Sequence, residues 1–289
     1  MSAAEKTAGS APTRSRPIVG WGVHDGLVVA RRNLIQTVRV PELLFFSLVQ
    51  PVIFVLLFAF VFGGAIPIPG ADPGSAPDTS VYRQYLMPGI FGQTVAFAAA
   101  ASTVGLAEDM HRGLIDRFRS LPMSTGAVLF GRTFADAARQ ILVLIVLGIT
   151  GYLVGWRIND GVFNATLAFI LLLFFAYTVA WVGSWIGLYM PNPETANTAG
   201  LVWLFPLTFL SNAFVPITSM PDWLQPIAQW NPISSLVLAT RDLFGNPTGI
   251  IGDAWPQQNP VLYTLISCAV LIAIFAPLSI RRYRRTTAR

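Results

Sequence analysis

The segment Glu108–Gly126, EDMHRGLIDRFRSLPMSTG, is a short charged stretch between two long apolar runs, and it divides the chain into two hydrophobic halves. At helical spacing Ile115 and Phe118 lie along one side of this segment, and its charged residues lie along another. Leu121 and Pro122 end the helix, because proline disfavours helical geometry in the residue before it. We expect a short amphipathic helix at a membrane surface. The alternative is a solvated loop whose arginines only fix the orientation of the chain.

The composition on either side of this segment is that of a membrane protein. The chain has 289 residues, of which 54% are hydrophobic and only 11% are charged, with a mean hydropathy of +0.59. Soluble domains carry about 25% charged residues. The apolar residues come in blocks of about 20, the length at which a helix spans the hydrocarbon core of a bilayer. The fold class expected is therefore an all-α polytopic membrane protein.

The ionisable residues exclude several functions. A net charge of +5 reports membrane orientation rather than affinity for nucleic acid, so no nucleic-acid partner is expected. One cysteine, Cys268, and two histidines cannot form a Cys/His cage, so no metal site is expected.

Six transmembrane helices are predicted, at about 43–62, 85–107, 141–156, 165–189, 198–216 and 260–280. Residues 1–17 are rich in small and polar residues and are predicted to be a disordered tail. Residues 18–42 have the pattern of an amphipathic helix lying in the membrane interface.

The stretch 217–255 is moderately apolar but interrupted by Pro221, Pro226, Pro232 and Pro247. A single spanning helix would not tolerate these prolines. We therefore expect a re-entrant hairpin of short helices, followed by the last span and a basic tail at 281–289.

Basic residues predict the orientation. With six spans, sixteen of the nineteen basic residues fall on the side that holds both termini and the segment 108–126. The other side has Arg83, Arg157 and Arg241. By the positive-inside rule both termini are cytoplasmic, and the hairpin is extracellular.

No ATPase site is expected in the chain itself. Gly126–Thr133, GAVLFGRT, is one residue away from a phosphate-binding loop, but it has Arg132 where that loop has lysine, and no strand precedes it. Energy must then come from a partner or from an ion gradient.

The predicted span cores contain no Asp, Glu, Lys, Arg or His, which argues against proton coupling and suits an apolar or amphipathic substrate. The polar residues within them are candidates for the substrate path: Gln50, Gln93, Ser102, Ser184 and Asn212. For each of these the alternative is helix–helix packing, which is also the expected role of the glycine pairs Gly151–Gly155 and Gly183–Gly187.

Four stretches, Gln50–Gly64, Tyr85–Phe97, Glu108–Arg132 and Asn212–Leu243, resemble one known family. They are similar to the ABC-2-type permeases, and within these to the daunorubicin-resistance group of bacterial drug and lipid exporters. The third and fourth stretches carry most of the specificity.

The resemblance implies a six-span ABC-2 exporter fold with an N-terminal connecting helix, a cytoplasmic coupling helix at about 109–119 and an extracellular hairpin. The resemblance also implies a similar assembly, in which two membrane subunits bind two ATPase subunits that hold ATP and Mg. The two membrane subunits would be two copies of this chain, a homodimer. The chain would itself bind no cofactor and would lie in a bacterial plasma membrane.

Matched by position, the resemblance implies that ATPase coupling involves Glu108, Asp109, Arg112, Gly113, Ile115, Asp116, Arg117, Phe118, Arg119, Leu121 and Pro122. In the hairpin Asn231, Pro232 and Arg241 match the family, and Trp223 is an interface aromatic residue. The implied function is ATP-driven export of a hydrophobic or amphipathic drug or lipid. The alternatives are an ABC-2 exporter of a glycan or glycolipid, and a gradient-driven carrier or channel.

Overall fold

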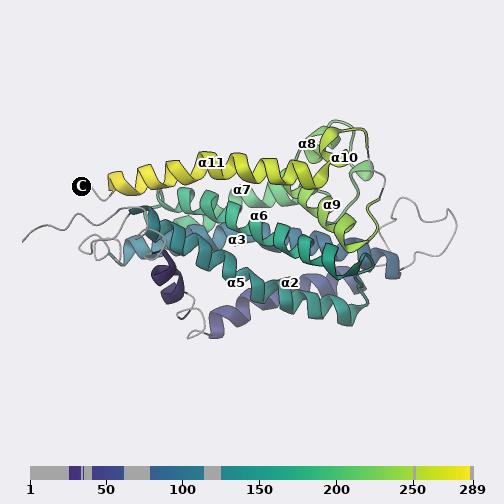
Figure 1. Ribbon diagram of the computed structural model, residues 1–289, viewed down its shortest axis with the longest axis horizontal. Helices are drawn as coiled ribbons and strands as arrows, with labels where there is room; N and C mark the ends of the chain where they lie inside the picture. Colours follow the sequence, from purple (N-terminus) through teal and green to yellow (C-terminus); the bar gives the residue numbers. More distant parts are fainter. Residues whose placement is uncertain are drawn as a thin grey trace, which may run out of the picture.

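The computed structural model describes residues 26–33, 35, 41–61, 79–113, 125–249 and 252–286, and all regular structure in these ranges is helical. Long helices run side by side along the molecule, and short ones gather at one end (Figure 1). The long helices are α2 (Pro41–Phe60), α3 (Thr79–His111), α5 (Thr125–Val154), α6 (Gly161–Gly187), α7 (Pro193–Phe209) and α11 (Pro260–Thr286). The short ones are η1 (Ile217–Ser219), α8 (Gln225–Gln229), α9 (Pro232–Phe244) and α10 (Trp255–Gln258).

Several of these helices can cross a membrane. Within the described ranges, α3, α5 from Gly126, α6 and α11 are the four that are long and apolar enough. Helices α2 and α7 are not among these four. The apolar stretch described in α2, Leu48–Phe60, is shorter, and α7 has only 17 residues. The chain is thus a multi-pass membrane protein.

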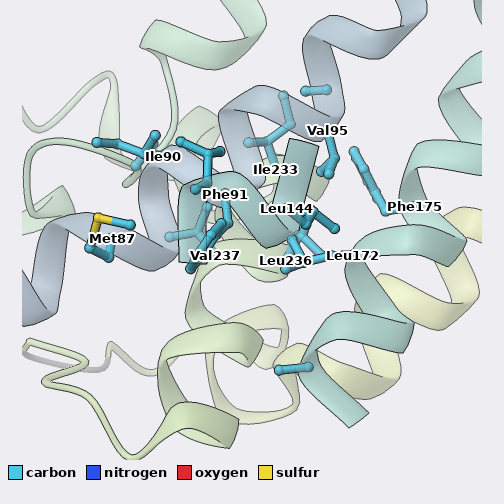
Figure 2. Packing of buried hydrophobic residues seen from close by; sticks show 14 of the residues in the cluster. Met87, Ile90, Phe91, Val95, Leu144, Leu172, Phe175, Ile233, Leu236 and Val237 are labelled. Carbon is cyan, nitrogen blue, oxygen red and sulfur yellow. The ribbon is translucent and has the colours of Figure 1, made fainter. Parts of the chain in front are cut away.

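Helix α3 lies at the centre of the bundle, against α2, α5, α6, α7 and α9. Its apolar side chains meet those of α5, α6 and α9 in one buried cluster (Figure 2). The labelled members are Met87, Ile90, Phe91, Val95, Leu144, Leu172, Phe175, Ile233, Leu236 and Val237. The hairpin helix α9 therefore belongs to the core and is not an appendage.

Small residues let the backbones of α3 and α6 touch. A Cβ on Gly183 would lie 2.1 Å from the carbonyl oxygen of Ala99, and one on Gly187 would lie 2.6 Å from that of Thr103. The packing role predicted for this pair is confirmed. The other pair differs: a Cβ on Gly151 would meet the Met87 side chain, whereas Gly155, with φ 108°, ends α5.

The basic segments gather at one end of the bundle. The helical segment 26–33 crosses α5 closely, because a Cβ on Gly131 would lie 2.2 Å from the carbonyl oxygen of Gly26. Beside this crossing Leu106, Leu129 and Tyr283 form a buried cluster that brings the last turns of α3 and α11 to the first turns of α5. Figure 1 shows the segment 26–33 at the same end as the last turns of α11, with α8, α9 and α10 opposite.

Helix α5 begins earlier than the predicted third span. The sequence predicts a span from Ile141, whereas the helix starts at Thr125 and continues without a break. The polar turns before Ile141, which hydropathy places outside the span, are part of the same continuous helix. Arg132, Asp136 and Arg139 therefore belong to a helix that can cross the membrane.

We predict that Gly183→Ala destabilises the bundle, because the added methyl group meets backbone rather than a movable side chain. Overpacking of this kind costs about 1–3 kcal/mol. The melting temperature of the purified chain in detergent should fall. The control is Gly148→Ala, because a Cβ there meets no atom within 4 Å. Equal melting temperatures for the two variants would contradict the close approach of α3 and α6.

Candidate functional site

A cavity of about 610 Å³ lies between α2, α3, α5 and α7, and polar and charged side chains form much of its lining. Its volume is within the roughly 300–1,000 Å³ typical of small-molecule sites. The apolar lining includes Phe54, Phe97, Val104, Val143 and Leu201. The polar lining is Asn33, Gln50, Gln93, Thr94, Glu108, Asp109, Arg132, Asp136, Arg139, Gln140 and Asn197.

Helical periodicity places the charged part of this lining. Arg132, Asp136 and Arg139 recur every three to four residues along α5 and so share one face. Gln93 and Glu108, from opposite halves of α3, face the same cavity. The spacing on α5 is visible in the sequence and could have identified Asp136, Arg139 and Gln140, which the sequence prediction omitted.

The Asp136 carboxylate is buried in this wall and is compensated from two sides. Ser102 Oγ donates a hydrogen bond to its Oδ2 at 2.7 Å, and Arg139 Nη2 lies 3.8 Å from its Oδ1. A buried charge without such partners is costly in a helix that spans a membrane. Ser102, predicted to lie on the path, thus lies behind the cavity wall and positions a charged residue of that wall.

An ion pair between Arg132 and Asp109 ties the end of α3 to α5. Both side chains are mostly buried, at 14% and 22% exposed. Glycine makes room for the pair, because a Cβ on Gly105 would lie 2.0 Å from Arg132 Nη2. Arg32 of the segment 26–33 lines the same narrow gap as this pair, and burial lowers the pKa of its guanidinium below the ordinary value.

The described part of the coupling segment begins in the last turn of α3. Arg112 pairs with Glu108 one turn earlier, and both are exposed. Gly113 ends the helix in the left-handed region at φ 66°, with its N–H donating to the carbonyl oxygen of Met110 at 3.1 Å. Asp109 therefore belongs to α3, and any following helix starts after Gly113. Outside the described residues lie Ile115, Asp116, Arg117, Phe118, Arg119, Leu121 and Pro122.

The residues predicted to form a substrate path separate into two groups. Gln50 and Gln93 line the cavity, with Ser102 directly behind its wall. Ser184 is buried in α6 and Asn212 lies in the turn after α7, and neither lines the cavity. The sequence could not distinguish these groups, because it does not show which helix faces meet.

The hairpin is fastened to the bundle by Arg241, which is completely buried. Its Nε donates to the carbonyl oxygen of Tyr85 at 2.9 Å, and Nη2 donates to those of Asn212 at 2.9 Å and Ala213 at 3.2 Å. The guanidinium carbon lies 3.5 Å from the centre of the Tyr85 ring. No carboxylate in the described part of the chain pairs with Arg241, so carbonyl dipoles and the ring face compensate its charge.

Asn231 fastens the start of α9 in a similar way. Its Oδ1 accepts from the N–H of Ile233 at 2.9 Å, which caps α9, and Pro232 takes the first helical position. Its Nδ2 donates to the carbonyl oxygens of Leu207 at 2.6 Å and Leu210 at 3.2 Å, at the end of α7. Of the predicted hairpin residues only Trp223 is exposed; Asn231, Pro232 and Arg241 hold the structure together.

Comparison with known proteins gives consistent matches. The family described as "ABC-2 type transporter" matches residues 26–244. The daunorubicin resistance ABC transporter permease protein DrrB1 of Streptomyces coeruleorubidus is 31% identical, over 98% of this chain and 92% of that protein. The doxorubicin resistance ABC transporter permease protein DrrB of Mycobacterium tuberculosis is 27% identical over 80% of each chain. The putative transport permease ycf38 of Cyanophora paradoxa is 22% identical over 88% of this chain and 85% of its own length.

We predict that Arg241→Lys destabilises the chain although it keeps the charge. An ammonium group cannot reproduce the forked hydrogen bonds to three carbonyl oxygens while lying flat on the Tyr85 ring. The loss should be about 2–3 kcal/mol and should lower the melting temperature in detergent. The control is Arg281→Lys, at an exposed arginine on the last turns of α11. Equal losses in both variants would show that the buried arrangement is unimportant.

We also predict energetic coupling between Asp109 and Arg132. Asp109→Asn or Arg132→Met alone leaves a mostly buried charge without its partner and should cost about 2 kcal/mol, whereas the double substitution should cost less than the sum. Melting temperatures of the four proteins measure this cycle. The same cycle on the exposed pair Glu108 and Arg112 should give a coupling near zero. Additive losses at Asp109 and Arg132 would contradict the ion pair.

Proposed function

This chain belongs to the ABC-2 transporter family, and on that basis we propose that it is the membrane-spanning subunit of an ATP-driven exporter of hydrophobic or amphipathic compounds. The observation that carries the proposal is the ion pair of Asp109 with Arg132, which joins the cytoplasmic end of α3 to the wall of the polar cavity.

We assign six spans, α2, α3, α5, α6, α7 and α11, with the hairpin helices between α7 and α11 on the extracellular side of a bacterial plasma membrane. The distribution of arginines supports this topology. Arg32, Arg132 and Arg282 belong to segments at one end of the bundle, while Arg157 and Arg241 belong to the other. The positive-inside rule makes the first end cytoplasmic, together with both termini.

Energy would be supplied by a separate subunit. Gly126–Thr133, the stretch similar to a phosphate-binding loop, is part of the continuous helix α5, whereas such a loop wraps its backbone N–H groups around phosphates after a strand. We therefore place ATP and Mg on two copies of a partner ATPase, bound to a homodimer of this chain.

The coupling segment would transmit the movement. A partner that moves Gly113 and the residues after it displaces the last turn of α3, and Asp109 passes that displacement to Arg132 on α5. Asp136 and Arg139 lie one and two turns further along the same face, in the cavity wall. Closure of the ATPase pair would thus alter the walls around the substrate.

The lining of the cavity indicates the kind of substrate. Phe54 and Phe97 supply aromatic surface, while Gln50, Gln93 and the charged residues of α5 supply polar contacts. This mixture suits a compound with an apolar body and a polar group, such as a drug or a lipid. The relatives named for daunorubicin and doxorubicin resistance support a drug as substrate. A glycan or glycolipid is the alternative within the same architecture.

A gradient-driven carrier is the alternative from a different class, and one observation favours it. Asp136 is an ionisable group in a helix that can cross the membrane, as proton-coupled carriers require. Its hydrogen bond from Ser102 and its proximity to Arg139 support a positioning role instead.

The test introduces negative charge into the coupling segment. We predict that Phe118→Asp combined with Arg119→Glu abolishes both co-purification of an ATPase from host membranes and ATP-dependent uptake of an anthracycline into inverted vesicles. The membrane domain itself should keep its melting temperature. The control is Arg281→Glu, which reverses an exposed charge on the last turns of α11. Unchanged assembly and uptake, or uptake by the purified chain in proteoliposomes without any ATPase, would overturn the proposal.

A further inference from the structure

A second cavity, of about 630 Å³, lies between α5 and α6 and shares no residue with the first. Its wall runs from Ile141 to Tyr152 on α5, faces Phe169 and Leu173 on α6, and ends at the turn that contains Trp156 and Arg157. We call it the α5–α6 groove. Apart from Arg157 and the Tyr152 hydroxyl, the side chains that line it are apolar, except that Trp156 has a ring N–H, which donates a hydrogen bond to Asn246.

The floor of the groove is an aromatic ring that its neighbours hold in place. The Trp156 ring contacts Phe91 and Phe244 edge to face, with centroids 5.3 and 5.1 Å apart, and its Nε1 donates to Asn246 Oδ1 at 2.7 Å. At Gly148, in the middle of the α5 wall, a Cβ would meet no atom within 4 Å. The groove is therefore open at this point of its α5 wall.

The turn after α5 places a cation at the end of this channel. Gly155, with φ 108°, lets the N–H groups of Gly155 and Trp156 bond back to the carbonyl oxygens of Tyr152 and Gly151, at 3.3 and 2.8 Å. The chain reverses there and brings Arg157 over the Tyr152 ring, 4.0 Å from its centre.

Part of the Arg157 guanidinium remains available to a ligand. Nη1 donates to the carbonyl oxygens of Tyr152 and Trp156, at 2.6 and 2.8 Å. Within the described residues Nη2 and Nε donate to nothing, and no carboxylate pairs with the group. Asp160, the nearest acidic residue along the chain, does not line the groove, and its carboxylate accepts from Asn164 at 2.5 Å.

The length of the groove matches one leaflet of a bilayer. The α5 wall covers eleven residue steps, or roughly 16 Å at 1.5 Å per residue, and one leaflet contributes about half of a hydrocarbon core of roughly 30 Å. Exposed residues on α5, among them Ile145, Ile149 and Tyr152, form its rim. A lipid whose acyl chain lies along the groove would thus have its headgroup at the depth of Arg157.

We propose that the α5–α6 groove binds one acyl chain of an anionic phospholipid from the leaflet on the hairpin side, with the headgroup phosphate on Arg157. The lipid packs against Trp156, whose ring also contacts Phe91 of α3 and Phe244 of α9, and so it stabilises the outer half of the bundle. This site is independent of the polar cavity and of any ATPase.

The experiment uses the full chain, reconstituted in nanodiscs that contain equal amounts of phosphatidylglycerol and phosphatidylcholine with the same acyl chains. After extraction in mild detergent, native mass spectrometry counts the lipids retained per chain. The wild type should retain one lipid, with about a fivefold preference for phosphatidylglycerol, the ratio that one basic residue near a membrane surface supplies.

Two variants separate the headgroup from the acyl chain. Arg157→Gln should reduce the preference to about one, and Gly148→Phe, which fills the groove, should reduce retention of both lipids several-fold. Ile145→Trp fills it from an exposed position and replaces Gly148→Phe if that variant does not fold. The controls Val270→Phe and Arg281→Gln change exposed positions on α11 in the same way and should behave as the wild type.

Three results would overturn the proposal. Equal retention of both lipids by the wild type would mean that Arg157 does not select an anionic phospholipid. Retention unaffected by both Gly148→Phe and Ile145→Trp would exclude an acyl chain in the groove. Loss of dimers in those variants with an unchanged lipid count would mean that a second copy of the chain covers the groove.

Discussion

A charge that is buried away from water is costly, so each charge buried inside this bundle has to be compensated by the protein. Asp136 is compensated by Ser102 and Arg139, Asp109 by Arg132, and Arg241 by three carbonyl oxygens and an aromatic ring. Ser102 and Asp109 link α3 to α5 in this way, and Arg241 links α9 to α3. The same requirement that makes a buried charge costly therefore makes it a specific contact between elements.

The two ends of α3 use this fastening differently. Near its beginning, Tyr85 accepts from Arg241 and fixes the hairpin to the bundle through contacts that are wholly buried. Near its end, Asp109 holds Arg132 in a pair that is still partly open to solvent. Helix α3 thus connects a wholly buried contact at the hairpin end of the bundle to a partly exposed ion pair at the other end.

Much of this architecture could be predicted from the sequence. Apolar blocks located the long helices, prolines located the short ones of the hairpin, and the residues around Glu108 and Asn231 indicated the family. What the sequence could not give was burial. Arg241 counts as one more positive charge outside the membrane in any tally of residues, yet it is a completely buried clamp.

Hydropathy likewise placed the turns around Arg132 outside the predicted third span, although they belong to the same helix, α5. Ser184 and Asn212 looked equivalent to Gln93, because hydropathy weighs a residue without regard to the helix that lies opposite. Only the placement of α2, α3, α5 and α7 around one cavity distinguishes them.

Gly105 has a consequence for how such chains diverge. The Arg132 guanidinium occupies the space that a side chain at position 105 would need. A larger residue at position 105 would displace the guanidinium, and its ion pair with Asp109 would then have to form in a different geometry. Because these groups share one space, the cost of a substitution at position 105, 109 or 132 should depend on the residues at the other two.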